Sequence, residues 1–233
     1  MALPKLNSVS YELTLPSTGE KVEYRPFLVK EEKALMLAQQ SGKEADMLRA
    51  VENIIEDCTF GKMKKGEHAF FDIEYVFLQL RAKSVGETVD ATVTCLDDKE
   101  TRVSVKINLE DVKCVKNLEH KEKIELTEDI GVIMRHPKVA DLMLIDSSNP
   151  ETTFELIESC VHQIYDADNV YEKNDMDKKD LKDFIESLTH EQFQEVNAFF
   201  DTMPKVKHSV KVKNPNTGVE SEVVLEGMAN FFG

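Results

Sequence analysis

Three segments of the chain share one pattern, in which two short runs of alternating apolar and polar residues flank a polar turn. The paired runs are residues 11–15 with 20–24, 88–95 with 101–109, and 208–213 with 219–225. Alternation with a period of two places every second side chain on the same face of a strand, and a turn between two such runs indicates a hairpin. The sequence therefore predicts three antiparallel β-hairpins, at the N-terminus, the centre and the C-terminus.

Between these hairpins, apolar residues recur at the spacing of amphipathic helices. Helices are expected over residues 44–58 and 72–84. Asn149 and Pro150 predict the start of another helix, and Thr189 with Gln192 forms a capping-box pattern ahead of a further one that Pro204 closes. The stripe expected on the helix after Pro150 is made of Phe154, Ile157, Cys160, Val161 and Ile164. Hairpins separated by helices, without a regular strand-helix-strand rhythm, predict an α+β fold.

The length of 233 residues is enough for one large or two small domains. A polar, charge-rich connector at residues 116–123 predicts a boundary after Val115. We therefore expect an N-terminal α+β domain over 1–115, with two hairpins and helices, and a C-terminal α+β domain over 116–233, with helices and the last hairpin. Residues 166–179 are nearly devoid of apolar side chains and are a second candidate linker.

The charge and the apolar pattern exclude two classes of partner. A formal net charge of −15 argues against nucleic acid, whose binding depends on a basic surface. No apolar run approaches the roughly 20 residues that cross a bilayer, and the first residues lack the apolar stretch of a signal peptide. We expect a protein that stays in the cytoplasm where it is made, with four widely spaced cysteines as reduced thiols.

No motif in the sequence predicts catalysis, a metal or a cofactor. The acidic stretch at residues 166–177 lacks the glycine and the final glutamate of a calcium-binding loop, and Cys95 has no second cysteine nearby for zinc. Nine glycines are scattered without a phosphate-binding loop. The histidines also lie far apart in sequence and outside any catalytic motif: His68, His120, His136, His162, His190 and His208.

Aromatic and methionine side chains supply the candidate partner-binding residues. The helix that follows Phe70 and Phe71 is apolar on more than one face, so it is either fully buried or a docking surface. Met228, Phe231 and Phe232 lie beside the chain end, where apolar residues either fold back onto the protein or bind a partner. These five residues are the predicted contacts.

The segment Arg25-Pro26-Phe27-Leu28 is predicted to be a structural corner. Proline disfavours helical backbone at the residue before it, so the chain turns out of the first hairpin at Arg25. We expect Phe27 and Leu28 to enter the core before a helix begins near Lys30.

Several segments of the chain resemble a known protein family. They are residues 24–33 (YRPFLVKEEK), Asp57-Cys58, residues 80–87 (LRAKSVGE), residues 199–204 (FFDTMP), residues 225–227 (LEG) and Phe231-Phe232. Taken in order, these segments resemble the baseplate hub subunits and hub assembly proteins of T4-type tailed bacteriophages, through most of the chain.

The resemblance implies a structural or assembly protein of the central hub of a contractile tail. Such a protein binds other baseplate hub or tail proteins, without enzymatic activity or a cofactor, in the host cytoplasm during assembly. Hub relatives sometimes carry a cysteine pair on a hairpin, but only Cys95 is present here, so a zinc site is not carried over. Incorporation into the virion tail baseplate, a homo-oligomer, an acidic host-directed binding protein and an enzyme of unrecognised type remain open.

Overall fold

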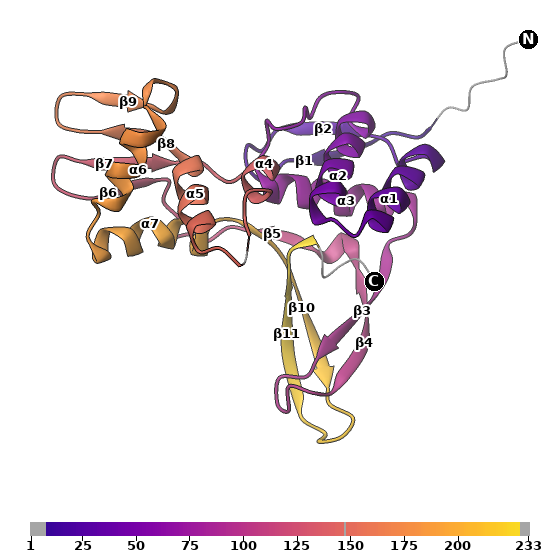
Figure 1. Cartoon of the computed structure of the whole chain (residues 1–233). Coiled ribbons are helices and arrows are strands. Elements are labelled where there is room, and N and C mark those ends of the chain that lie inside the picture. The colour runs from indigo at the N-terminus through magenta and orange to yellow at the C-terminus, as the bar shows by residue number, and fades with distance from the viewer. Residues whose placement is uncertain (1–7, 147, 229–233) are drawn as a thin grey trace, which may run out of the picture. The chain divides into compact units, whose positions relative to one another are not determined.

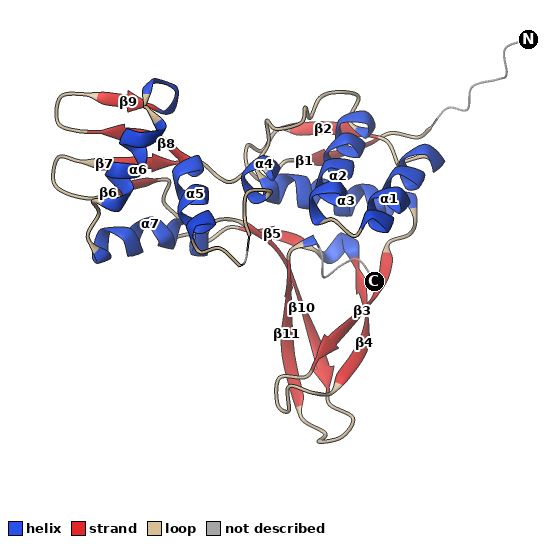
Figure 2. Cartoon of the chain, in the orientation of Figure 1, coloured by secondary structure: helices blue, strands red, loops and turns tan. Residues whose placement is uncertain are grey.

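The computed structural model describes residues 8–146 and 148–228, and it divides the chain into two compact units. Unit 1 contains the chain up to Val115 together with the segment that begins at Lys205, and unit 2 contains Lys116–Pro204. Figure 1 colours the chain along its length, and Figure 2 shows short strands interspersed with helices in both units. All strand pairing among the described residues is antiparallel, which confirms the predicted α+β class.

Unit 1 begins with a hairpin, continues through three helices and ends in two longer hairpins. Its helices are α1 Val29–Ser41, α2 Glu44–Cys58 and α3 Phe70–Ser84, with a 3-10 turn η1 at Leu109–Asp111. Its strands are β1 Tyr11–Thr14, β2 Lys21–Tyr24, β3 Thr88–Thr94, β4 Arg102–Asn108, β5 Lys113–Val115, β10 Lys205–Lys213 and β11 Glu220–Glu226. The three predicted hairpins are confirmed as β1–β2, β3–β4 and β10–β11.

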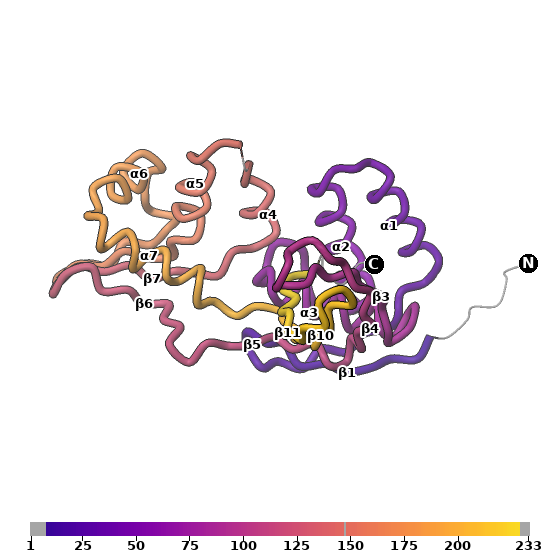
Figure 3. The backbone as a smooth tube through the Cα atoms, turned by 90° about the horizontal axis from the view of Figure 1, so that it is seen from below, coloured from indigo at the N-terminus to yellow at the C-terminus, as the bar shows by residue number. Residues whose placement is uncertain are grey.

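The hairpins β3–β4 and β10–β11 pack against each other and form what we call the hairpin arm (Figure 1). Every second residue of β3 is buried, as strand periodicity requires, and these residues share one core with β10 and with Leu78 and Ala82 of α3. Figure 3 shows β10 and β11 beside α3 in a second view. Helix α3 is thus covered on several sides, which explains its all-round apolar sequence.

The third hairpin belongs to unit 1, in contrast to the predicted C-terminal domain of 116–233. Lys205, Val206 and Lys207 of β10 pair with Val115, Cys114 and Lys113 of β5. The predicted boundary after Val115 coincides with the edge of unit 2, but a second boundary follows Pro204. No local sequence pattern predicts that the chain re-enters unit 1 at β10, because the pairing of β10 with β5 joins segments that lie about 90 residues apart.

Unit 2 contains a four-stranded antiparallel sheet in the order β6-β7-β8-β9, with helices that complete its core. Its strands are β6 Lys123–Glu125, β7 Gly131–Met134, β8 Val161–Tyr165 and β9 Val170–Glu172. Its helices are α4 Val139–Leu142, α5 Glu151–Cys160, α6 Lys178–Glu186 and α7 His190–Thr202, with a 3-10 turn η2 at Lys173–Asp175. Val132, Ile157, Val196 and Phe199 lie in one buried cluster.

Two expectations for unit 2 differ from the structure. Helix α5 ends at Cys160, whereas Val161 and Ile164, predicted on its apolar stripe, lie on β8, and Phe154 is exposed. The run from Val161 to Tyr165 is rich in residues that favour strands, and pairing with β7 outweighs continuation of the helix. The candidate linker 166–179 contains β9 and η2 and reaches into α6. The capping box of Thr189 and Gln192 is confirmed at the start of α7.

Candidate partner-binding surface

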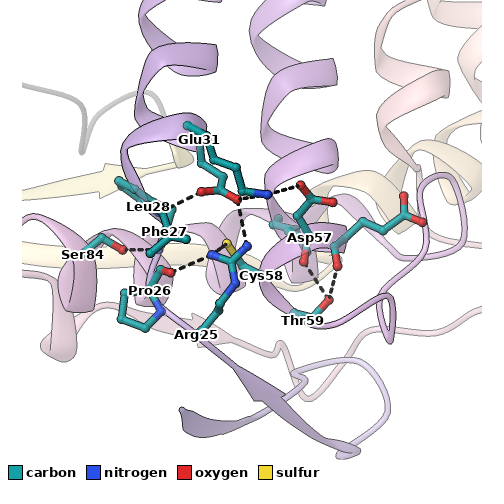
Figure 4. Close-up of polar contacts among 12 residues, drawn as sticks. Arg25, Pro26, Phe27, Leu28, Glu31, Asp57, Cys58, Thr59 and Ser84 are labelled. Atoms are coloured by element: carbon teal, nitrogen blue, oxygen red, sulfur yellow. Dashed lines mark hydrogen bonds and ion pairs between the residues drawn. The ribbon is translucent and has the colours of Figure 1, made fainter. Parts of the chain in front are cut away.

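Arg25 organises the corner between β2 and α1 (Figure 4). One Nη atom of its guanidinium donates to Oε1 of Glu31 at 2.8 Å, and the other lies 3.0 Å from the carbonyl oxygen of Pro26 and 3.5 Å from Sγ of Cys58. The backbone N–H of Arg25 also donates to the carbonyl of Cys58 at 2.9 Å. We call this group the Arg25 clamp. It ties the end of β2 to the start of α1 and the end of α2.

Glu31 is the acceptor at the centre of the Arg25 clamp. Its second carboxylate oxygen accepts from the backbone N–H of Leu28 at 2.8 Å, which caps the start of α1. Burial alone would raise the pKa of Glu31, but the bonds from Arg25 and Leu28 outweigh it and the pKa is lowered. The ionised carboxylate and the charged guanidinium therefore stabilise each other in a nearly closed site.

The predicted corner at Arg25-Pro26-Phe27-Leu28 exists, but only one of its two apolar side chains turns inward. Phe27 is half-buried and stacks on Phe77 at 6.5 Å between ring centroids, and its N–H donates to Oγ of Ser84 at 2.9 Å (Figure 4). Leu28 is the N-cap of α1 and is exposed, contrary to expectation. The capping geometry turns its backbone toward Glu31 and leaves its side chain at the surface.

The same arrangement occurs a second time, at the corner between β7 and α4. Arg135 makes a bidentate pair with Asp141 at 2.7 and 3.0 Å, and its N–H donates to the carbonyl of Cys160 at 2.7 Å. Oδ2 of Asp141 accepts from the N–H of Lys138 at 2.8 Å, which caps α4. We call this group the Arg135 clamp. Each unit therefore joins a hairpin, a capped helix and a helix that ends in cysteine through one arginine.

Helix α1 presents most of its large apolar side chains to the surface instead of to a core. Of its residues, only Glu31 and Ala38 are buried. The exposed apolar side chains are Leu28 at 47%, Val29 at 78%, Met36 at 61% and Leu37 at 57%. Met36 and Leu37 come seven and eight residues after Val29, which is about two helical turns, so the three side chains lie on one side of the helix. We call these four residues the α1 face.

The tips of the hairpin arm are joined by polar side chains. Nδ2 of Asn214 lies 3.0 Å from both carboxylate oxygens of Asp97 and 2.9 Å from Oδ2 of Asp98, and Oγ1 of Thr217 donates to Asp97. The bond from Thr217, followed by that from Asn214, lowers the pKa of Asp97. Cys95 is buried at the base of this tip. Side-chain hydrogen bonds therefore connect the two turns.

The predicted contact residues that the structure describes differ in how deeply they are buried. Phe71 is buried in unit 1, and Phe70 is half-buried. Met228 is also buried, and its N–H donates to Oε1 of Glu74 at 2.7 Å. Phe231 and Phe232 lie outside the described residues. Phe71 and Met228 thus contribute to the interior of unit 1 and are not part of an exposed surface.

Sequence reasoning missed both arginine clamps and the α1 face. The shared signal was an arginine at the end of a strand, a proline within the next two residues and an acid six residues after the arginine, at Glu31 and Asp141. An acid three residues into a helix is the ordinary capping position, so this spacing could have indicated both corners. The exposure of the α1 face has no comparable signal, because apolar residues in a helix ordinarily indicate burial.

Comparison with known proteins identifies the family. None of the described helices has the length and apolar character needed to cross a membrane. Searches of curated proteins and of solved structures gave no match. The family model described as T4 bacteriophage base plate protein matches residues 8–233, which is nearly the whole chain. The chain therefore belongs to the T4 bacteriophage base plate protein family.

Proposed function

We propose that this baseplate protein is a structural or assembly component of the central tail hub and that it works by binding other hub or tail proteins through the α1 face. Its site of action would be the host cytoplasm during assembly and the baseplate of the tail. Membership of a baseplate family supports partners that are phage structural proteins. The observation that carries the binding mode is the exposure of four apolar residues at and along one capped helix.

The α1 face has the physical properties of a docking surface. Fully burying an apolar side chain of this size is worth about 1.5–3 kcal/mol relative to leaving it in water, so a partner that covers all four gains substantial affinity. The Arg25 clamp fixes the first turn of α1 before binding, which lowers the ordering cost of association. The occupant we expect is an apolar patch on another hub or tail protein.

The charge of the chain adds a second criterion for that partner. A net charge of −15 attracts a protein whose binding surface is rimmed by lysine and arginine and repels acidic competitors. Electrostatic attraction of this kind accelerates association and weakens at high salt. The apolar α1 face would supply the affinity, and the net negative charge of the chain would favour basic partners.

Purification of the tagged chain from infected cells tests this function. The wild type should co-purify with hub or tail proteins, and fractionation of intact tails would show whether it remains in the particle. The Met36→Glu/Leu37→Glu variant should lose these partners, while the control Ala34→Glu/Gln39→Glu, also exposed on α1, should retain them. A wild type that captures no tail protein would contradict the hub role. Retention of partners by the first variant would contradict the α1 face alone.

A further inference from the structure

Two histidines that are 16 residues apart come together at the open end of the β6–β7 hairpin. Lys123 pairs with Ile133, and continuing this register outward by three residues on each strand places His120 opposite His136. The N–H of Met134 donates to the carbonyl of Glu122 at 2.8 Å, which extends the pairing in that direction. The Nε2 atoms of the two imidazoles lie 3.1 Å apart.

Helix α7 packs against both histidines through Phe199 and Thr202. The ring of Phe199 lies 4.9 Å from that of His120 and 5.4 Å from that of His136, between centroids. Oγ1 of Thr202 donates to the carbonyl of Ala198 at 2.6 Å and lies 3.0 Å from Nδ1 of His120. Because its hydroxyl proton is engaged, Thr202 accepts from Nδ1–H of His120. The lone pair on Nε2 of His120 is therefore directed at His136.

We propose that His120, His136 and Glu122 form a binding site for a divalent transition metal of the zinc type. Zinc binds imidazole nitrogen at about 2.0–2.1 Å, so two tetrahedral imidazole ligands lie about 3.3 Å apart, close to the observed separation of the Nε2 atoms. The three side chains each bring a ligand atom within 4.8 Å of the others. Glu122 is exposed, so its carboxylate can rotate to become the third ligand.

The contacts of His120 also suit a metal ligand. The bond between His120 and Thr202 supplies the outer support that orients a ligating histidine. A bound ion would link the segment that precedes β6 to the segment that follows β7, next to α7.

Metal titration of the full chain tests the site. After treatment with a chelator, the protein should bind one Zn²⁺ per chain in competition with a chromophoric indicator. Co²⁺ should produce the visible absorption of a four-coordinate nitrogen and oxygen site. His120→Gln and His136→Gln should each weaken Zn²⁺ binding at least 100-fold, and Thr202→Val should weaken it about 10-fold because it removes only the outer support.

Two controls keep the result decisive. His162→Gln removes an exposed histidine of unit 2 outside the cluster and should leave Zn²⁺ affinity unchanged. Glu122→Gln changes an exposed side chain without disturbing the core, so it serves if the histidine variants fail to fold, and it should weaken binding at least 10-fold. Absence of stoichiometric binding, unchanged affinity in His120→Gln or Glu122→Gln, or an equal loss in His162→Gln would overturn the proposal. The test does not depend on the proposed function.

Discussion

The two arginine clamps make similar contacts in different settings. In unit 1 the side chains of Arg25 and Glu31 are 11% and 3% exposed, and a helix of 13 residues follows. In unit 2 the side chains of Arg135 and Asp141 are 31% and 10% exposed, and α4 has only four residues. Both arginines bond the carbonyl of a cysteine that ends a helix. The clamp therefore fixes the corner and the first helical turn, while the helix beyond it varies in length.

The difference in helix length has a functional consequence. Helix α4 has four residues and makes about one turn beyond its N-cap. Helix α1 has 13 residues and is long enough to include Met36 and Leu37. Because α1 buries so little of itself, most of its support comes from the Arg25 clamp and from its neighbour α2. Unit 1 thus has an exposed apolar helix on a rigid base, and α4 has no equivalent extension.

Loss of Arg25 should have the largest effect on stability. Arg25→Ala removes the guanidinium from buried Glu31 and leaves it the exposed ammonium of Lys30 at 3.1 Å, and breaking a buried pair in this way typically costs about 3–5 kcal/mol. Urea denaturation followed by the amide NMR signals of each unit should show the loss in unit 1. Arg25→Met/Glu31→Gln removes both charges, keeps an acceptor for the N–H of Leu28, and should recover much of it. If the double variant is as unstable as the single one, the buried charge is not the cause.

The corresponding change in unit 2 should be smaller. Arg135 is more exposed than Arg25, so water can solvate Asp141 when the guanidinium is removed. We expect Arg135→Ala to cost about 2–3 kcal/mol, measured by the same NMR-detected denaturation. An equal or greater loss than in Arg25→Ala would show that exposure does not distinguish the two clamps.

His136 should make unit 2 less stable as the pH falls. Burial, aided by nearby positive charge, lowers its pKa from 6.5 to about 4, so the unfolded chain binds the proton more readily between these values. Stability is retained above pH 6.5 and lost as the pH falls toward 4, by about 2 kcal/mol after allowing for partial exposure. Denaturation with a chelator present should show this slope. The slope should decrease in His136→Asn, and a slope unchanged in the variant would assign it to other groups.

Glu74 should give unit 1 the opposite dependence. Burial raises its pKa from 4.5 to about 7; the bond from the N–H of Met228 lowers the pKa, and the negative charge of Glu226 raises it further. The folded state therefore binds the extra proton, and stability present below pH 4.5 is lost as the pH rises through 7. Glu74→Gln keeps an acceptor for Met228 and should stabilise unit 1 by about 1–2 kcal/mol at pH 8. A destabilised variant would show that the carboxylate itself is required.

Local patterns predicted much of the fold, and contacts between distant segments account for what they missed. The three hairpins and the capping box at Thr189 follow from short-range rules, and the structure has them. The β6–β7 hairpin was missed because β6 is only three residues long with one buried side chain, Ile124, and β7 is an apolar run without the alternation that marks a strand. The pairing of β10 with β5 and the meeting of His120 with His136 depend on the register of those segments, which no local pattern specifies.

Site-specific photo-crosslinking tests the α1 face most directly. A photoreactive amino acid is placed at Met36 and, as a matched control, at Lys182 on the exposed side of α6, and each protein is expressed during infection. We expect irradiation to link the Met36 position to a specific baseplate or tail protein and the Lys182 position to link that protein weakly or not at all. Equal crosslinking at both positions, or no phage protein at Met36, would contradict binding through the α1 face.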